Sequence, residues 1–216
     1  MKLFKGKKVL ITSGPTVERI DPVRYISNFS SGKMGKSLCS AFANAGADVT
    51  VVTGPVNVEY NDAAKVIKVE SAREMLQACE GEFENCDITI CCAAVCDYRP
   101  KVFHDSKLKK GTDDASLSTI ELVKNPDILK TLSRLKTPAQ KVIGFSAETD
   151  NLLANATVKL ESKGCDMVVA NDVSGGQVFS KDKTAATLLT KNSTVDFARG
   201  SKDELAELIV AEVAKL

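Results

Sequence analysis

Five short apolar runs alternate along the chain with segments whose apolar residues recur at helical spacing. Strands that are apolar on consecutive residues are buried on both faces, which is typical of a parallel sheet covered by helices on both sides. The alternation therefore predicts an α/β fold with a Rossmann-like, mostly parallel sheet and helices on both faces. The five runs are Val9–Thr12, Asp48–Thr53, Ile88–Val95, Val142–Ser146 and Asp166–Ala170.

Capping residues mark the starts of several expected helices. Ser71–Glu74 and Ser201–Glu204 match the capping box, and Asn125 followed by Pro126 reads as a cap and a first turn. A further helix is expected from about Thr149 to Lys163. Two apolar stripes are expected to be buried, namely Ile128, Leu129, Leu132 and Leu135, and Leu205, Ile209, Val213 and Leu216.

The second half of the chain adds two features to the alternating pattern. Thr184–Thr190 and Thr194–Phe197 are separated by a short polar turn, which predicts a late antiparallel hairpin. Residues 98–115 are polar and rich in lysine. They read as a flap over the site, with an ordinary solvated loop as the alternative. No linker or repeat divides the sequence, so residues 1–216 are expected to form one domain.

Composition excludes several classes of protein. An apolar content of 44% is enough to bury a core, while 29 basic against 28 acidic residues give a net charge of +1. A general nucleic-acid binder would normally be strongly basic. No apolar run approaches the length of about 20 residues that spans a membrane, and no signal peptide is recognisable. We expect a cytoplasmic protein with neither nucleic-acid nor membrane partners.

Seven cysteines and a single histidine, His104, bear on metal binding. Four of the cysteines lie close together in sequence at Cys86, Cys91, Cys92 and Cys96, without a Cys-x-x-Cys pair. Two of the four fall within a predicted buried strand. Thiols in such a place usually act as small core residues, so neither a thiolate metal site nor a disulfide is expected.

The first predicted strand leads into a long polar loop and then into a helix. The loop contains Ser13-Gly-Pro-Thr16 and, further on, Asp21-Pro-Val-Arg-Tyr-Ile-Ser-Asn-Phe-Ser-Ser-Gly-Lys-Met-Gly35. Backbone N–H groups at a helix N-terminus favour anions, and glycine lets the backbone approach a ligand closely. Loops between a strand and a helix usually have about two to six residues. The extra length predicts a site for a phosphate or a carboxylate.

Common nucleotide-binding motifs match this loop only in part. Residues 30–37 would lack the first glycine of a P-loop and do not directly follow a strand. A dinucleotide fingerprint needs three glycines in the first turn and an acid after the second strand, yet Ser13–Glu18 has one glycine and that strand ends in Thr53-Gly54. A nicotinamide-dependent oxidoreductase and a P-loop ATPase therefore stay as weaker alternatives. A single histidine also disfavours a Ser-His-Asp hydrolase.

Polar groups gather where the predicted strands end. Asp97 follows the buried strand and Asn125 begins a helix. The carboxyl ends of parallel strands meet at one edge of the sheet, where α/β proteins bind ligands. Together with lysines, these groups predict an anion-binding pocket that suits a nucleoside triphosphate with magnesium. The lysines concerned are Lys107, Lys109 and Lys110 in the flap, and Lys159 and Lys163 on one helical face.

Several segments resemble the phosphopantothenate–cysteine ligase family, also called phosphopantothenoylcysteine synthetase. The most specific of them are Ser27–Gly35 and Ala93–Pro100. The resemblance runs in order from about residue 8 to the C-terminus. It is also carried by Ile11–Thr16, Asp21–Gly35, Lys107–Lys110, Val123–Ile128, Gly144–Thr149 and Val169–Val173.

The resemblance implies a step of coenzyme A synthesis. The carboxylate of 4′-phosphopantothenate would attack the α-phosphorus of a nucleoside triphosphate, and the amine of L-cysteine would then displace the nucleotide. Val123–Ile128 and Lys107–Lys110 look like the bacterial form, which uses CTP and Mg²⁺ and passes through an acyl-cytidylate. Catalysis would consist mostly of positioning and charge stabilisation.

The resemblance also implies roles for individual residues. Asn28 would hold the acyl-cytidylate, and Lys107 would neutralise developing charge from the flap. Arg24 and Ala93 would contact phosphopantothenate, with a structural salt bridge as the alternative for Arg24. The implied nucleotide contacts are Cys91, Cys92, Ala93, Asp97, Lys107, Val123, Lys124, Asn125, Pro126, Phe145, Lys159 and Lys163.

The family implies a homodimer with the site at the subunit junction. In many bacteria a flavin decarboxylase domain precedes the ligase, so the chain reads either as a stand-alone ligase or as an excised domain, with the decarboxylase separate or fused. Cys96 and Ser146 depart from the family pattern by small substitutions. A regulatory subunit would be favoured if Asn28 or Lys107 were replaced, and both are present.

Overall fold

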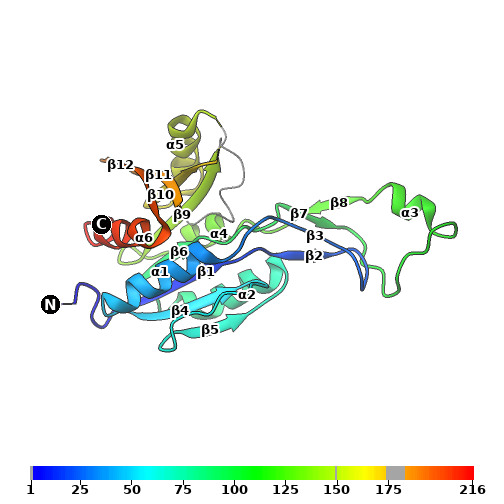
Figure 1. Ribbon diagram of the computed structural model, residues 1–216, viewed down its shortest axis with the longest axis horizontal. Coiled ribbons are helices and arrows are strands. Elements are labelled where there is room, and N and C mark those ends of the chain that lie inside the picture. Colours follow the sequence, from blue (N-terminus) through cyan, green and yellow to red (C-terminus); the bar gives the residue numbers. More distant parts are fainter. Residues whose placement is uncertain (1, 149, 174–182) are drawn as a thin grey trace.

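The computed structural model describes residues 2–148, 150–173 and 183–216, which build a central eight-stranded sheet (Figure 1). The strand order is β12-β11-β10-β9-β6-β1-β4-β5. The strands from β10 to β5 pair in parallel, and β11 and β12 extend one edge in antiparallel fashion, which confirms the predicted sheet and hairpin. The strands are β1 (Lys8–Ser13), β4 (Asp48–Thr53), β5 (Lys65–Lys68), β6 (Ile88–Cys91), β9 (Lys141–Glu148), β10 (Met167–Asp172), β11 (Lys183–Thr190) and β12 (Thr194–Ser201).

Helices cover both faces of the sheet, as the continuous apolar strands predict. On one face α1 (Lys33–Asn44) and α6 (Lys202–Val213) pack against each other and the strands. The other face is covered by α2 (Ala72–Phe83), α4 (Ile128–Leu135) and α5 (Leu152–Lys163). The strands thus contribute side chains to two apolar cores, one on each side.

The predicted caps of α2 and α6 are confirmed. The hydroxyl of Ser71 accepts a hydrogen bond from the Glu74 backbone N–H, and Ser201 and Glu204 form a complete capping box. Helix α5 begins at Leu152, and residue 149, where its start was expected, lies outside the described residues.

The predicted cap of α4 is wrong. Asp127 caps this helix by accepting from the Lys130 backbone N–H, whereas the Asn125 side chain donates to the carbonyl of Cys96. The predicted stripes are each one residue too long, because Leu135 and Leu216 lie in the last turn or beyond it and are 56% and 37% exposed. The other members of both stripes are buried.

The strand predicted over Ile88–Val95 ends at Cys91, because the four residues that follow leave the sheet and turn toward the loop after β1. Strand β5 had no prediction. It lies at the edge of the sheet and is mostly exposed, so its sequence lacks the apolar run of a buried strand.

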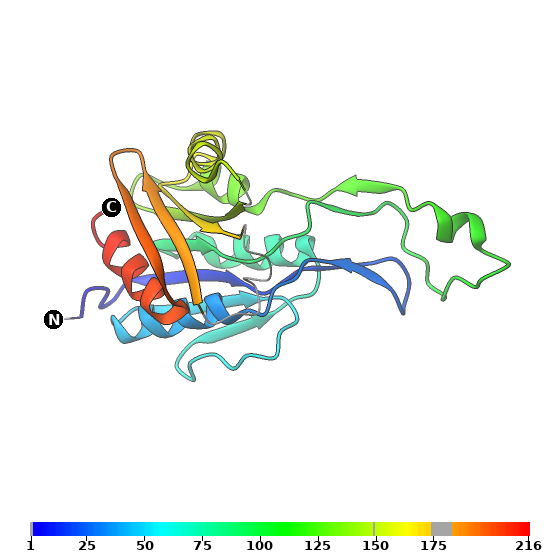
Figure 2. The ribbon, with the colours of Figure 1, turned by 45° about the horizontal axis from the view of Figure 1, so that its top comes forward.

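An arm projects from the sheet at the end where β1 and β6 finish (Figures 1 and 2). Two small antiparallel pairs form it, β2 (Val17–Arg19) with β3 (Tyr25–Ser27) and β7 (Tyr98–Pro100) with β8 (Leu122–Lys124), and α3 (Asp114–Ser118) lies toward its tip. Residues 98–115, predicted as a flap, belong to this arm.

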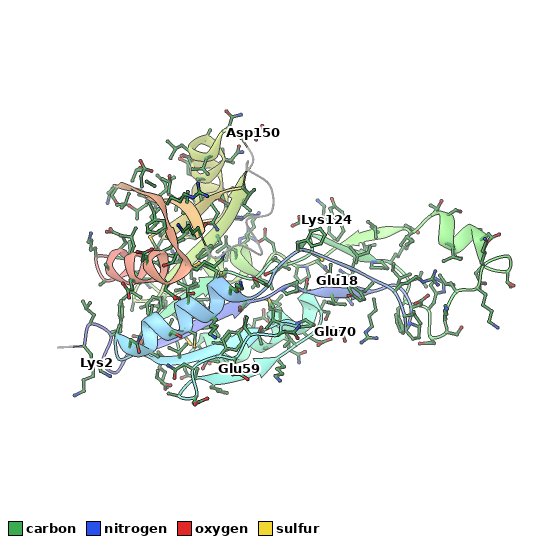
Figure 3. All side chains as sticks on the ribbon, viewed as in Figure 1. Lys2, Glu18, Glu59, Glu70, Lys124 and Asp150 are labelled. Atoms are coloured by element: carbon green, nitrogen blue, oxygen red, sulfur yellow. The ribbon has the colours of Figure 1, made fainter. Side chains whose placement is uncertain are left out.

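The arm is joined firmly to the sheet layer at α2 (Figure 3). The buried carboxylate of Glu18 accepts from the backbone N–H of Ala72 at 2.9 Å, and Arg19 donates to Glu70 at 2.8 Å. Within the described part of the chain, no helix is both long and apolar enough to cross a membrane.

Leu132 and Leu135 form a matched pair on α4. We expect Leu132→Ala to lower the free energy of unfolding by about 2–5 kcal/mol, because it empties a fully buried position. Leu135→Ala changes an exposed position and should cost less than about 1 kcal/mol. Urea unfolding of both variants measures the difference, and equal losses would contradict this assignment of the buried face.

Candidate active site

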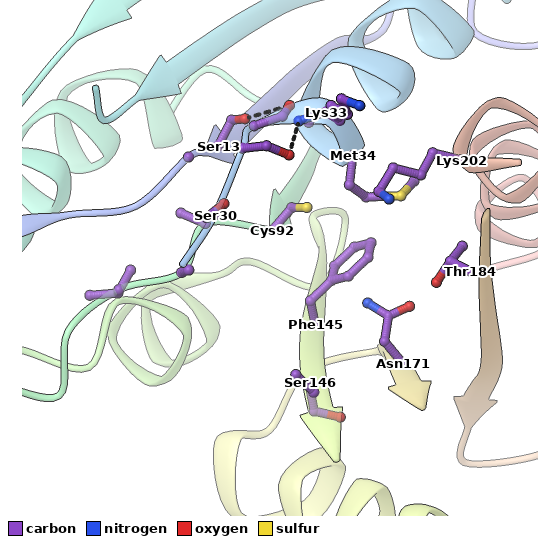
Figure 4. A pocket seen from close by; sticks show the side chains of 18 of the residues that line it. Ser13, Ser30, Lys33, Met34, Cys92, Phe145, Ser146, Asn171, Thr184 and Lys202 are labelled. Atoms are coloured by element: carbon purple, nitrogen blue, oxygen red, sulfur yellow. Dashed lines mark hydrogen bonds between the residues drawn. The ribbon is translucent and has the colours of Figure 1, made fainter. Parts of the chain in front are cut away.

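Two cavities adjoin at the carboxyl ends of β1, β6 and β9, one of about 300 Å³ and one of about 440 Å³. Five residues line both and form the boundary between them: Ala93, Val95, Asp97, Phe145 and Lys159. All but Val95 are among the predicted site residues. We call the smaller space the first cavity (Figure 4) and the larger the second cavity.

Hydrogen bonds between two loops hold this end of the sheet together. The backbone N–H of Ala93 donates to Thr12 Oγ1 at 3.1 Å, and that of Ala94 donates to the carbonyl of Gly14 at 2.9 Å. The Thr16 N–H returns a bond to the Ala94 carbonyl. The loops after β1 and β6 therefore form one unit beneath both cavities.

The first cavity is lined by the beginning of α1, as the sequence predicts for an anion site. Gly32, the N-cap, has a φ of 74°, and Gly14 has a φ of 71°, which favours glycine at both positions. Ser30, Ser31 and these glycines line the space. The positive end of the helix dipole lies here, so the cavity suits a phosphate or a carboxylate.

Several polar groups of the first cavity escaped sequence analysis. Asn171 ends near Phe145 and Thr184 in Figure 4, and its Oδ1 is buried without a hydrogen-bond partner among the described residues. Lys33 and Lys202 also line the space. Asn171 follows the apolar residues of β10, and this position near the carboxyl end of a parallel strand is the signal that could have identified it.

The second cavity is braced by Asn125. Its backbone N–H donates to the Asp97 carbonyl at 2.8 Å, its side chain donates to Cys96, and its Oδ1 accepts from Arg99 at 3.1 Å. Lys124, Asn125 and Pro126 line this cavity as expected. Asn125 therefore joins the loop before α4 to the loop after β6.

An ion pair lies at the far side of the second cavity, between Lys163 and Asp127. Partial burial raises the pKa of Asp127, but hydrogen bonds from Lys163 and from the Lys130 backbone outweigh it, so the pKa is lowered. Lys159 lines both cavities from the same helix face as Lys163. The predicted pair of lysines is thus brought to the site.

The cysteines at the site are unsuited to nucleophilic chemistry. Cys91 lines the second cavity and Cys92 the first. Burial raises the pKa of the Cys91 thiol well above its usual value and that of Cys92 to about 12, with Lys202 opposing the rise for Cys92. Both stay protonated near neutral pH. The described residues contain no cluster of three or more His, Cys, Asp or Glu that could hold a metal ion.

Asn28 touches the wall of the site without lining either cavity. Its Nδ2 donates to the carbonyls of Ala94 and Val95 at 3.3 and 3.1 Å. Val123 pairs with Arg99 in the arm, next to Lys124 of the second cavity. Asn28 and Val123 thus lie next to residues that line the cavities, and their roles stay predictions.

Arg24 and Lys107 line neither cavity. They lie on the arm, where the Arg24 guanidinium pairs with Asp21 and donates to the Leu108 carbonyl at 2.8 Å. The salt bridge considered for Arg24 therefore exists, and it fixes the chain next to Lys107.

Asp21 organises this part of the arm and is 1% exposed. Its carboxylate accepts from the backbone N–H groups of Val23, Arg24 and Leu108. Burial raises the pKa of Asp21, but the Arg24 guanidinium and these N–H groups outweigh it and hold the pKa well below its ordinary value. The carboxylate is ionised at neutral pH.

Known proteins resemble this chain over nearly its whole length. Residues 4–216 match the family described as "DNA/pantothenate metabolism flavoprotein C-terminal domain". The chain is 48% identical over 210 residues to the coenzyme A biosynthesis bifunctional protein CoaBC of Haemophilus influenzae, covering 97% of this chain and 52% of that protein. The Escherichia coli protein of that name is 40% identical, with the same coverage. The chain thus spans about half the length of these relatives.

A solved structure extends this similarity to the fold. The crystal structure of the C-terminal domain of a coenzyme A biosynthesis bifunctional protein CoaBC has a TM-score of 0.85 and 38% identity to this chain. The match covers 100% of this chain and 97% of that one.

Asp21→Asn should loosen the arm at neutral pH. A lowered pKa means that ionised Asp21 stabilises the folded arm above about pH 4, and that this stabilisation is lost as pH falls through the folded pKa. We expect the amides of Val23 and Leu108 to exchange hydrogen faster in the variant at pH 7. Asp105→Asn, at an exposed position on the same arm, is the control. Unchanged exchange in Asp21→Asn would show that the carboxylate does not hold the arm.

Proposed function

Because this chain belongs to the DNA/pantothenate metabolism flavoprotein C-terminal domain family, we propose that it joins 4′-phosphopantothenate to L-cysteine at the expense of CTP. One observation carries the proposal. Two cavities share lining residues at the carboxyl ends of the central strands, and Asn28 donates hydrogen bonds to Ala94 and Val95 there. Such a pair of spaces can hold a nucleotide and a second substrate with their reacting groups adjacent.

The nucleotide would lie across the boundary formed by Phe145. Phe145 would pack on it, Asp97 and the backbone from Cys91 to Ala93 would contact it, and Val123 to Pro126 would line the base side. Lys159 and Lys163 would meet the triphosphate. These assignments are supported by the cavity linings, since all but Val123 border one or both spaces.

The reaction would proceed in two displacements. The phosphopantothenate carboxylate attacks the α-phosphorus of CTP, forming a P–O bond and releasing pyrophosphate. The cysteine amine then attacks the acyl carbon, forms the amide and expels CMP. Asn28 would orient the acyl group, and cationic side chains would stabilise the charge that develops in both steps.

Magnesium fits this site as a companion of the triphosphate. Mg²⁺ usually binds through one or two carboxylates together with substrate phosphates and water, rather than in an all-protein cage. The carboxylates that border the second cavity are Asp97 and Asp127, and a metal-holding cluster is absent from the described residues. Bound magnesium would offset the negative charge of the leaving pyrophosphate.

A homodimer would complete the site, since Arg24 and Lys107 line neither cavity and belong to the arm, which projects from the sheet (Figures 1 and 2). The arm exposes a set of large apolar side chains that a partner subunit could cover: Val23, Tyr25, Val102, Phe103 and Leu122. In this arrangement Arg24 would contact phosphopantothenate and Lys107 would close over the intermediate in the partner's site.

The CoaBC relatives are named bifunctional proteins. We therefore expect a flavin decarboxylase as a partner of the ligase, either fused to it or on a separate chain. A cytoplasmic location, like the absence of nucleic-acid partners, stays a prediction.

Pyrophosphate release tests the function directly. With 4′-phosphopantothenate and magnesium, we expect release that is faster with CTP than with ATP, and amide formation once cysteine is added. Faster release with ATP would contradict the nucleotide assignment alone. No release with either nucleotide would overturn the proposed ligase.

Subunit complementation tests the junction. Lys107→Gln and Asn28→Asp should each reduce turnover greatly, the second by placing a negative charge beside an anionic adduct. When the two variants are mixed and allowed to exchange subunits, half of the dimers are hybrids with one intact site. Activity should then return to about a quarter of the wild-type value. No recovery despite subunit exchange would place Lys107 in its own subunit's site.

A further inference from the structure

A loop that has no role in the proposed function packs behind the residues that line the first cavity. Residues 54–60, here called the rear loop, follow β4 and pack against the loops that line the cavity. Figure 3 labels Glu59, which precedes the last residue of this loop, Tyr60. Tyr60 is partly buried against the apolar core that α1 covers.

Three hydroxyl groups join the rear loop to the cavity. Tyr60 Oη donates to Ser13 Oγ at 2.9 Å and lies 2.9 Å from Thr53 Oγ1. Ser13 Oγ in turn donates to the carbonyl of Gly32 at 3.4 Å. Ser13 is fully buried and lines the first cavity at the end of β1 (Figure 4). Hydrogen bonds thus connect the rear loop to the start of α1 through the Ser13 side chain.

Close packing makes the position of Ser13 critical. A Cβ atom at Gly35, in the first turn of α1, would lie 2.0 Å from Ser13 Oγ. Cβ atoms at Gly14 and Gly32 would lie 2.7 and 2.9 Å from Val56 Cγ1 of the rear loop. The backbone that lines the cavity is therefore in contact with the rear loop from behind, and with Ser13 from the side.

We infer that Tyr60 is a positioning residue for nucleotide binding, acting through Ser13 on the backbone of Gly14 and of Gly32. This inference rests on the proposed function, in which the nucleotide borders the first cavity. Without the Tyr60 hydroxyl, the buried Ser13 oxygen loses its donor, and only its own hydrogen bond to the Gly32 carbonyl still orients it. The beginning of α1 then loses a fixed neighbour, and the N–H groups that face an anion are held less well in place.

Neither the family resemblance nor the motifs of the chain identify Tyr60. It lies between two strands in a loop without a motif, and its role follows only from contacts with residues 7 and 47 positions away. Burial raises the pKa of Tyr60, while the contacts with Ser13 and Thr53 oppose the rise. The hydroxyl therefore keeps its proton throughout the pH range in which binding is measured.

A double-mutant cycle separates positioning from a general effect on the fold. CTP binding in the presence of magnesium is measured by calorimetry for the wild-type chain, Tyr60→Phe, Ser13→Ala and the double variant. A net hydrogen bond corresponds to about a 2- to 10-fold change in an equilibrium constant. We expect Tyr60→Phe to raise the dissociation constant for CTP by that factor when Ser13 is present. In the Ser13→Ala background, the same substitution should change the logarithm of that constant by less than half as much.

Ser193→Ala, which removes an exposed hydroxyl that hydrogen-bonds Thr190 between β11 and β12, is the control and should bind CTP as the wild-type chain does. Hydrogen exchange of the backbone amides of residues 30–36 is a second measurement. Exchange should be faster in Tyr60→Phe than in the wild-type chain and unchanged in the control variant. Equal losses in both backgrounds, or unchanged affinity and exchange, would overturn the role of Tyr60. Absence of CTP binding by the wild-type chain would instead overturn the proposed function, and this inference with it.

Discussion

The pairing of the loops after β1 and β6 is the interaction on which the site depends. Thr12, near the end of β1, and Gly14, just after it, accept hydrogen bonds from the backbone N–H groups of Ala93 and Ala94, which follow β6. These bonds satisfy backbone groups that would otherwise be orphaned where the strands leave the sheet. They also set the wall that Asn28 contacts, and they direct the chain into the two halves of the arm. One junction therefore places the cavities and the arm relative to each other.

The sequence predicted the buried parts of this fold well, because burial on both faces leaves a continuous apolar run. Strand β4 was predicted with its observed bounds. The same rule misled over Ile88–Val95, where small residues continue the apolar run after the strand has ended. It also missed β5, whose exposed edge position needs few apolar residues. Asn125 was misread because a capping asparagine and a bracing asparagine look alike until Cys96 and Arg99 are in place.

Part of the site was predictable, from polar groups near the strand ends, from lysines that share a helix face and from the family resemblance. Asp97, Phe145 and Lys159 were expected and line both cavities. Thr184 and Lys202 reach the first cavity from the late hairpin and the start of α6, which sequence order separates widely from the other residues. A contact across that distance depends on how the sheet edge folds back, and no local pattern encodes it. The position of the arm could not be predicted for the same reason.

Local charge, rather than the total, makes this end of the molecule suited to anions. The whole chain carries a net charge of only +1, so long-range attraction would contribute little. Yet, among the residues that the structure describes, Lys33, Lys159 and Lys202 line the first cavity together with the carboxylate of Asp97. The second cavity holds Lys163 against Asp127, which compensates part of its positive charge. The beginning of α1 adds the positive end of its helix dipole to the first cavity, and the overall charge of the chain gave no sign of this local arrangement.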